Sequence, residues 1–296
     1  MGIHWYPGHM YKATKAMIEL LPQVDIIIEL IDARIPYSSS NPVIAKIAKE
    51  KACIRIINKA DLADPKITAL WRKNINDTKC IKTLSCDLGT KEQIPQIMNL
   101  CCSLSVNKIG QPTVVLVVGI PNVGKSTLIN ALAGRRVAST GDEPAVTKGQ
   151  QRVNLRNGII LIDTPGILWG KVENESSSFR LAATGAIKNT VMTYEEVAIF
   201  AARYLLDNYP KYLKRRFIFS DMPLTESDLL DHIGIKRGCL GAGGRIDRER
   251  AATIFINELR SGAIGKISLE TPELIDQESL HLKPSLTEIT GALGVK

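Results

Sequence analysis

The 296-residue sequence has no apolar run near the roughly 18–20 residues that a bilayer-spanning helix requires. Its longest candidates, such as 25–31, have only the length of a strand. The first residues, MGIHWYPGHMYK, also lack the charged and then apolar pattern of a signal peptide, and they lack the Arg- and Ser-rich character of a transit peptide. We therefore expect a cytoplasmic protein that is neither exported nor inserted in a membrane.

Cysteine spacing typical of a zinc site or a disulfide framework is missing as well. The six cysteines form no C-x-x-C pair and no histidines are interleaved with them. We expect ordinary core thiols in a reducing compartment.

The composition, with 45% hydrophobic and 23% charged residues, is that of a folded globular protein. The length exceeds the roughly 100–200 residues of one domain, which predicts a core domain and a smaller appendage. Residues 205–296 contain 13 Lys or Arg and 13 Asp or Glu, so the whole net charge of +8 lies in residues 1–204. Such an excess suits a polyanionic partner, or it serves only solubility.

Short β-branched runs alternate with helical patterns, which predicts a mostly parallel sheet covered by helices on both faces. Strands are expected at 25–33, 52–58, 80–86 and 113–119, with a hairpin of 150–155 and 158–163 that turns at Asn157-Gly158. Helices are expected between them at 41–50, 65–76, 91–104 and 125–134. After about Gly170, helical patterns cover 176–219, 224–233 and 247–260, and the tail from Leu269 shows no periodicity.

A phosphate-binding loop follows the apolar run TVVLVV and opens a predicted helix. Its sequence, GIPNVGKST, fits G-x-x-x-x-G-K-[ST] from Gly119 to Thr127. Backbone N–H groups near Val123 and Gly124 would cradle the phosphates, and the helix N-terminus would add partial positive charge. Lys125 would reach the β- and γ-phosphates, and the Ser126 hydroxyl would bind Mg²⁺.

The guanine-binding motif NKAD closes another apolar run at 58–61. A carboxylate only accepts hydrogen bonds, and guanine offers donors at N1 and N2 where adenine does not, so Asp61 would select guanine. Asn58 would contact N7, and the Lys59 stem would lie along the ring. Ser85 and Cys86, in the SCD that ends the next predicted strand, suit the remaining base-contacting loop.

Two segments are predicted to respond to the γ-phosphate. In DTPG, which follows the run GIILI, Asp163 would hold Mg²⁺ through a water and the Gly166 N–H would sense the γ-phosphate. Thr147 is the expected threonine whose hydroxyl completes the Mg²⁺ shell, with Thr140 as the alternative. Loss of the γ-phosphate would release both segments.

The order of these motifs is unusual, because NKAD (58–61) and SCD (85–87) precede the phosphate loop (119–126) and DTPG (163–166). Together with DARIP at 32–36 and HWYPGHM at 4–10, this order resembles the circularly permuted GTPases of the RbgA/YlqF family. The resemblance implies a permuted P-loop GTPase domain at 1–175 and a small all-helical domain at 176–296 that binds RNA.

The resemblance further implies a monomeric GTPase that assists late maturation of the large ribosomal subunit and contacts a precursor of rRNA and ribosomal proteins. Two alternatives stay open. One is a GTP-dependent switch that recruits protein partners without touching RNA, and the other is a GTPase that serves an RNA-modifying enzyme. The second would need a further nucleophile or cofactor motif, and the sequence shows none.

Hydrolysis poses a problem, because the apolar residues after Gly166 cannot orient water as a glutamine does in many GTPases. Turnover should therefore be slow alone, and the resemblance implies that the large ribosomal subunit stimulates it. The resemblance points to His9 as a catalytic residue beside Lys125 and Gly166, the alternative being that His9 only packs the N-terminal arm. It also implies a K⁺ ion at Asn122, which would otherwise be an ordinary turn asparagine.

Basic side chains cluster twice in the second half of the sequence and are candidates for RNA phosphate contacts. They are Lys211, Lys214, Arg215 and Arg216 in one group and Arg245, Arg248 and Arg250 in the other. Acidic residues lie between them, so solvated helix faces explain the pattern equally well.

Overall fold

The computed structural model describes residues 15–42, 44, 51–75, 81–90, 92–105, 111–138, 151–155, 158–166, 168, 174–187 and 192–282. These residues form a six-stranded sheet in the order β3-β2-β1-β4-β6-β5. The strands are β1 (Ile26–Asp32), β2 (Ala52–Asn58), β3 (Ile81–Ser85), β4 (Thr113–Gly119), β5 (Gln151–Asn154) and β6 (Ile159–Asp163). Only β5 and β6 pair antiparallel, which confirms the predicted mostly parallel sheet and its hairpin.

The central strands are buried on both faces. All seven residues of β1 are buried, and β2 and β4 have the bounds that their apolar runs predict. Among the buried residues of β1 is Glu29, whose carboxylate accepts the Arg55 side chain of β2 at 2.6 Å and the Asn41 backbone N–H at 3.1 Å. The buried carboxylate of Glu29 is therefore paired within the core.

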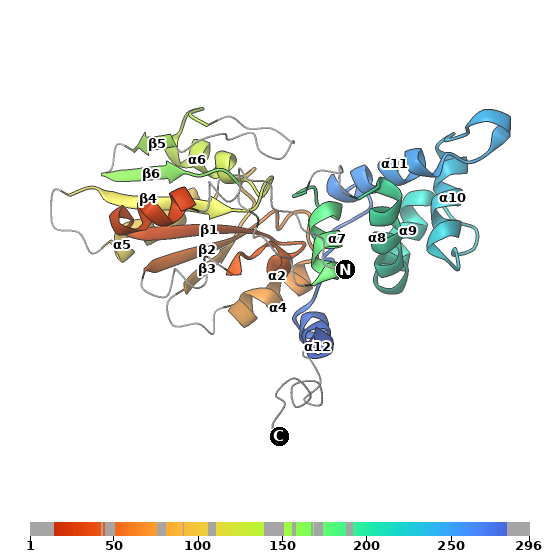
Figure 1. Ribbon diagram of the computed structural model, residues 1–296, viewed down its shortest axis with the longest axis horizontal. Helices are drawn as coiled ribbons and strands as arrows, with labels where there is room; N and C mark the ends of the chain where they lie inside the picture. Colours follow the sequence, from red (N-terminus) through yellow and green to blue (C-terminus); the bar gives the residue numbers. More distant parts are fainter. Residues whose placement is uncertain are drawn as a thin grey trace, which may run out of the picture.

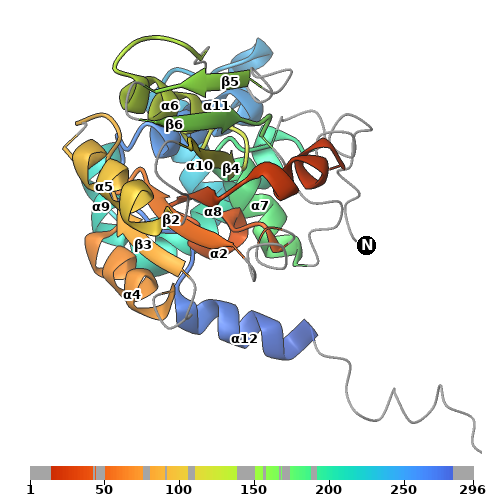
Figure 2. The ribbon, with the colours of Figure 1, turned by 90° about the vertical axis from the view of Figure 1, so that its left-hand side faces the viewer.

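Helices cover both faces of the sheet, as predicted. On one face α5 (Ile94–Leu104) and α6 (Lys125–Ala133) pack on alternate residues of β1 and β4. On the other face lie residues 15–20, the 3₁₀ turn η1 (Leu21–Gln23) and α4 (Pro65–Ile75). Residues 15–20 form a short helix, which we call the N-terminal helix; Figure 2 shows it and α5 on opposite sides of β4.

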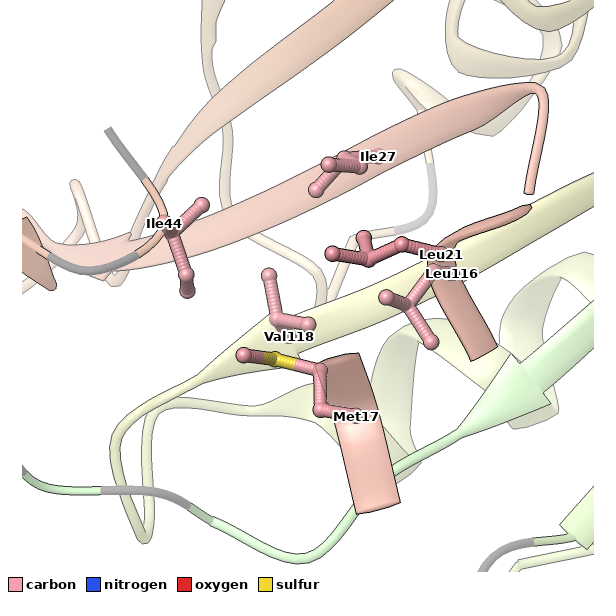
Figure 3. A pocket seen from close by; sticks show the side chains of 6 residues that line it. All are labelled: Met17, Leu21, Ile27, Ile44, Leu116 and Val118. Atoms are coloured by element: carbon pink, nitrogen blue, oxygen red, sulfur yellow. The ribbon is translucent and has the colours of Figure 1, made fainter. Parts of the chain in front are cut away.

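A small pocket beneath the N-terminal helix is part of this packing (Figure 3). Six apolar side chains line it: Met17, Leu21, Ile27, Ile44, Leu116 and Val118. Since no polar group faces it, the pocket offers nothing that could bind a nucleotide.

The helical half follows the sheet. Its helices are α7 (Glu175–Ala183), α8 (Tyr194–Asn208), α9 (Pro210–Phe217), α10 (Glu226–Lys236) and α11 (Arg248–Arg260), with the 3₁₀ turn η3 (Ala242–Gly244) before α11. Thr193 and Thr225 begin α8 and α10 with capping boxes. Figure 1 shows α7 between the sheet and the other four helices, and α7 contacts α2 (Pro36–Ser39) on one side and α8 and α11 on the other.

One helix contradicts the sequence-based expectation. The tail from Leu269 shows no periodicity, yet α12 occupies Pro272–Leu282. Its start is specified locally, because Thr271 Oγ1 accepts the Leu274 N–H at 3.1 Å and Pro272 and Glu273 suit the first turn. The periodicity is weak because α12 buries mainly Ile275, and another of its contacts is polar, the ion pair of Glu278 with Arg180 of α7.

Between α11 and α12 the chain returns to the sheet half, and we call residues 264–271 the strap. The Ile267 N–H donates to Leu62 O at 2.9 Å, and the Leu269 N–H donates to Arg34 O at 2.8 Å. The buried Glu270 carboxylate accepts the backbone N–H groups of Tyr37 and Ser38 and also the Ser38 hydroxyl. In the described part of the chain, every helix is too short or too polar to span a membrane.

Candidate nucleotide-binding site

The phosphate-binding loop joins β4 to α6, and its backbone has the conformation that its glycines permit. Gly119 and Gly124 have positive φ values of 154° and 105°. A Cβ on Gly119 would lie 2.6 Å from Leu30 O, and one on Gly124 would collide with the Asn58 side chain. Asn122 also has a positive φ, 57°. α6 begins at Lys125, so its unpaired N-terminal amides close the cradle.

Lys125 curls back into this loop. Its Nζ donates to Gly119 O at 3.1 Å and to Ile120 O at 2.8 Å. Burial lowers the pKa of Lys125 to about 8, and the nearby Asp163 charge offsets this only in part. A buried ammonium held by two carbonyls lacks a full countercharge, and a phosphate group would supply one.

Asp163, the last residue of β6, is the other buried charge. Burial raises the pKa of Asp163, and the Lys125 charge opposes the rise. Its Oδ1 has no hydrogen-bond partner among the described residues. Such an atom beside Lys125 fits the residue predicted to hold Mg²⁺ through water.

Gly166 lies against the phosphate loop. A Cβ there would come 2.7 Å from Pro121 Cα, so only glycine permits this close approach. Thr164 fixes the intervening backbone, because its hydroxyl donates to Val117 O of β4 at 2.8 Å. DTPG and the phosphate loop are thus in direct contact, as a γ-phosphate sensor requires.

Asn58 joins three loops that are distant in sequence. Its Nδ2 donates to Val123 O in the phosphate loop at 2.8 Å, and its Oδ1 accepts the Leu88 N–H at 3.3 Å in the loop after β3. The Cys86 Sγ lies 3.9 Å from the same Oδ1. The sequence predicted Asn58 as a base contact; in the structure Asn58 also connects the NKAD loop and the loop after β3 to the phosphate loop.

The other residues predicted to contact the base lie around this junction. Lys59 has a φ of 62°, and Asp61 is exposed. Ser85 ends β3 half-buried, and burial raises the pKa of the Cys86 thiol to about 12, so Cys86 stays neutral. In the first turn of α6, Ser126 is half-buried and Thr127 is exposed.

Two residues beside the site were not predicted to have a role. Asp32, which closes β1, lies 3.4 Å from Lys59 Nζ and 2.7 Å from Arg34 Nη2. Burial alone would raise the pKa of Asp32, but the two cations outweigh it and hold that pKa well below its usual range. A signal existed in the sequence, because Asp32 closes an apolar run just as Asn58 does, and the two are register partners.

Three predicted residues cannot be placed. His9, Thr147 and the alternative Thr140 lie outside the described residues. Asn122 is described, and its Nδ2 donates to Gly185 O, in the turn after α7, at 2.9 Å. The described residues contain no cluster of three His, Cys, Asp or Glu side chains that could bind a metal by themselves. A Mg²⁺ ion here would therefore depend on phosphate and water oxygens as well.

Comparison with known proteins agrees with this geometry. A family model described as 50S ribosome-binding GTPase matches residues 114–223, which include the phosphate loop and DTPG. Ribosome biogenesis GTPase A of Bacillus licheniformis is 43% identical over 282 residues, covering 92% of this chain and 99% of the relative. The protein of the same name from Thermotoga maritima is 33% identical, covering 91% and 94%.

Solved structures give the same result in three dimensions. A GDP-bound YlqF structure superposes with a TM-score of 0.65 at 29% identity, covering 87% of this chain and 99% of that one. A GNP-bound YlqF from T. maritima gives 0.62 at 28% identity. The permuted motif order, the sheet that brings the motifs together and these near full-length similarities agree, and the chain belongs to the ribosome biogenesis GTPase A family.

Proposed function

We propose that the chain binds GTP with Mg²⁺ between the phosphate loop and the NKAD loop, hydrolyses it to GDP, and thereby assists late maturation of the large ribosomal subunit. The observation that carries the proposal is the pair of Asn58 hydrogen bonds, 2.8 Å to Val123 O and 3.3 Å from the Leu88 N–H. They assemble base-contacting and phosphate-contacting loops into one site although the motifs occur in permuted order.

The phosphate end fits the proposed ligand. Lys125 would exchange its two carbonyl acceptors for β- and γ-phosphate oxygens, which removes the cost of an ammonium buried without a countercharge. Ser126 and Thr147 would hold Mg²⁺ directly and Asp163 would do so through water, which satisfies the unpaired Oδ1. The metal would neutralise charge that develops on the phosphates.

At the base end, Asp61 is exposed and therefore accessible to the N1 and N2 donors of guanine. The Lys59 ammonium is anchored by the ion pair with Asp32, and its stem would cover the ring. Ser85 and Cys86 would contribute the third loop around the base. Adenine would leave the Asp61 carboxylate without donors, which gives selectivity.

Hydrolysis needs a group that orients water, and neither Lys125 nor Gly166 can supply it. We assign this role to His9, brought into place by the ribosomal partner, while the Gly166 N–H senses the γ-phosphate. Asn122 would contribute to a K⁺ site. Without the partner, turnover would be slow.

The proposed partner is a precursor of the large ribosomal subunit, contacted mainly by residues 176–296 as a domain distinct from 1–175, with the protein acting as a cytoplasmic monomer. Ion pairs reduce the basic surface that was predicted from sequence, because Arg216 pairs with Glu258 at 2.8 Å and Arg248 pairs with Asp231 at 2.7 Å. The exposed residues on α9 that we propose contact RNA phosphates are Lys211, Lys214 and Arg215.

The test is GTP turnover by the purified chain in K⁺ or Na⁺ buffer, with and without large ribosomal subunits. We expect subunits to accelerate turnover by about 10-fold or more, and His9→Ala to lose that gain while still binding GTP. His4→Ala is the matched control from the same N-terminal segment. If turnover is the same with and without subunits, the proposed role in ribosome assembly is wrong.

Salt dependence separates RNA contact from a purely protein-recruiting switch. Phosphate contacts weaken steeply with salt, so subunit binding should fall by about 10-fold or more between 50 and 200 mM salt. A subunit affinity that changes neither with salt nor in Lys214→Ala would favour the protein-recruiting alternative.

A further inference from the structure

The turn at the C-terminal end of α7, residues 182–185, draws donors from three distant parts of the chain. Ala182 O accepts Arg260 Nη2 at 2.7 Å, and Ala183 O accepts Arg260 Nε at 3.1 Å. The next two carbonyls accept Arg34 Nη2 at 3.4 Å and Asn122 Nδ2 at 2.9 Å. A helix end leaves its last carbonyls unsatisfied and partly negative, so these donors are well matched to it. We call residues 182–185 the α7 turn.

Arg34 connects the α7 turn to the base end of the nucleotide site. Its Nε and Nη2 donate to the Asp32 carboxylate at 2.9 and 2.7 Å, and the same carboxylate pairs with Lys59 of NKAD at 3.4 Å. Both Asp32 and Arg34 are almost fully buried, with 2% and 3% of their surface exposed. Because Lys59 and Arg34 share the Asp32 carboxylate, movement of Lys59 changes the electrostatic interaction between Asp32 and Arg34. Water cannot easily replace Asp32 or Arg34 in this buried pair.

Asn122 connects the α7 turn to the phosphate end. It lies within the phosphate loop, between Pro121, which contacts Gly166, and Val123, whose carbonyl binds Asn58. Its positive φ leaves the backbone little freedom to adapt around the side chain. Arg34, beside the base end of the site, and Asn122, at its phosphate end, thus donate to two adjacent carbonyls, those of Thr184 and Gly185.

Arg260 connects the same turn to the helical half. It is the last residue of α11, and its guanidinium lies 5.7 Å from the centre of the Tyr194 ring at the start of α8. Its Nε lies 3.4 Å from the place where a Cβ would stand on Gly185, so the guanidinium covers the turn. Its own carbonyl accepts Arg34 Nη1 at 3.3 Å, which joins the two arginines.

We propose that the α7 turn couples the nucleotide site to α8 and α11, with Arg34 and Asn122 as positioning residues on the nucleotide side and Arg260 on the helical side. The coupling rests on the proposed function, since it requires a nucleotide between the phosphate and NKAD loops. Three side chains donate hydrogen bonds to these four consecutive carbonyls. A buried carbonyl that loses its donor raises the free energy of the folded chain. A shift of either loop on binding therefore moves the turn and, through Arg260, the ends of α8 and α11.

Hydrogen–deuterium exchange of the full chain tests this coupling, measured without nucleotide, with GDP and with a non-hydrolysable GTP analogue. In the wild type we expect bound nucleotide to slow amide exchange about 10-fold at 181–187 and also at 257–263 in the last turn of α11. In Arg260→Met, nucleotide affinity should stay within about threefold while the response at 257–263 disappears. Arg260→Lys, which keeps one charged donor, should restore part of it.

Arg203→Met is the matched control, because Arg203 is an exposed arginine of α8 that pairs with Glu226. Its response to nucleotide should equal that of the wild type. The coupling is overturned if bound nucleotide leaves 181–187 unchanged, or if Arg260→Met still transmits the change to α11. Failure of the wild-type chain to bind either nucleotide would instead overturn the proposed function, and the coupling would fall with it. If Arg260→Met does not fold, the comparison of Arg260→Lys with the wild type decides.

Discussion

Charged side chains are used differently in the sheet half and in the helical half of the molecule. Around the nucleotide site they are largely buried: Asp32 pairs with Arg34 and with Lys59 of the neighbouring loop, and Arg34 also donates to Thr184 O, 150 residues away. On α8 to α11 they form pairs near the surface, such as Arg248 with Asp231, whose side chains are 43% and 30% exposed. Loss of one partner of a buried ion pair strongly lowers the free energy of unfolding, because the other charge stays buried without a partner. Exposed ion pairs contribute little to that free energy. Substitutions should therefore have unequal effects in the two halves.

The largest effect on stability is expected at Glu270, where the strap meets the sheet half. Glu270→Ala removes the acceptor for two backbone N–H groups and the Ser38 hydroxyl, and removes a partner 3.7 Å from Arg180. We expect the free energy of unfolding to fall by about 3–5 kcal/mol, measured by urea denaturation. Asp231→Ala, from the exposed pair, is the control and should cost less than about 1 kcal/mol. Equal losses for both variants would abolish the contrast between the two halves.

Lys125→Met should separate ligand binding from stability. Loss of the phosphate-binding ammonium should weaken GDP binding about 100-fold, as titration with a fluorescent analogue would show. The free energy of unfolding should change little, because the loss of an ammonium buried without a full countercharge offsets the loss of its bonds to the Gly119 and Ile120 carbonyls. Lys214→Met, exposed on α9, should change neither quantity. A marked loss of stability in Lys125→Met would show that Lys125 is a structural residue.

The pH dependence of nucleotide binding should reveal the same lysine. Burial lowers the pKa of Lys125 to about 8 in the free protein, and bound phosphate would raise it. Binding must then take up a proton above pH 8, so affinity should be level below pH 8 and fall up to about 10-fold per pH unit above it. Lys125→Arg should flatten this slope, since arginine stays charged. An unchanged slope in that variant would assign the titration to another group.

The smallest effect is expected for the exposed pair of Arg248 and Asp231. A double-mutant cycle on these two residues should give a coupling energy of about 0.2–1 kcal/mol, reduced further by salt. A coupling well above that range would show that the helical half also relies on its charges for stability.

The sequence predicted those parts of the fold that are specified locally. β2 and β4 were predicted to the residue, because each is an apolar run followed directly by a loop motif, which must lie where the strand ends. α12 was missed, because its N-terminal cap is visible in the sequence but its buried face is too narrow for a periodic pattern.

The site was predictable as a set of motifs, but its long-range contacts were not. Nothing local indicates that Asn122 donates to Gly185, 63 residues away, or that Glu270 reaches Ser38. The expected basic clusters were reduced for the same reason, since Arg216 pairs with Glu258 and Arg248 pairs with Asp231, each on another helix. His9 and Thr147 lie outside the described residues, and their roles stay predictions.

The strand order also determines what the growing chain meets during its own synthesis. β1, β2 and β3 are adjacent in the sheet and come from one continuous stretch, residues 26–85, so they can pair before β4 has been made. Until then β1, whose seven residues are all buried in the finished protein, presents an open apolar edge. β4, which carries the phosphate-binding loop at its end, is the strand that closes this edge. The nascent chain thus remains prone to mispairing until it acquires the segment on which nucleotide binding depends.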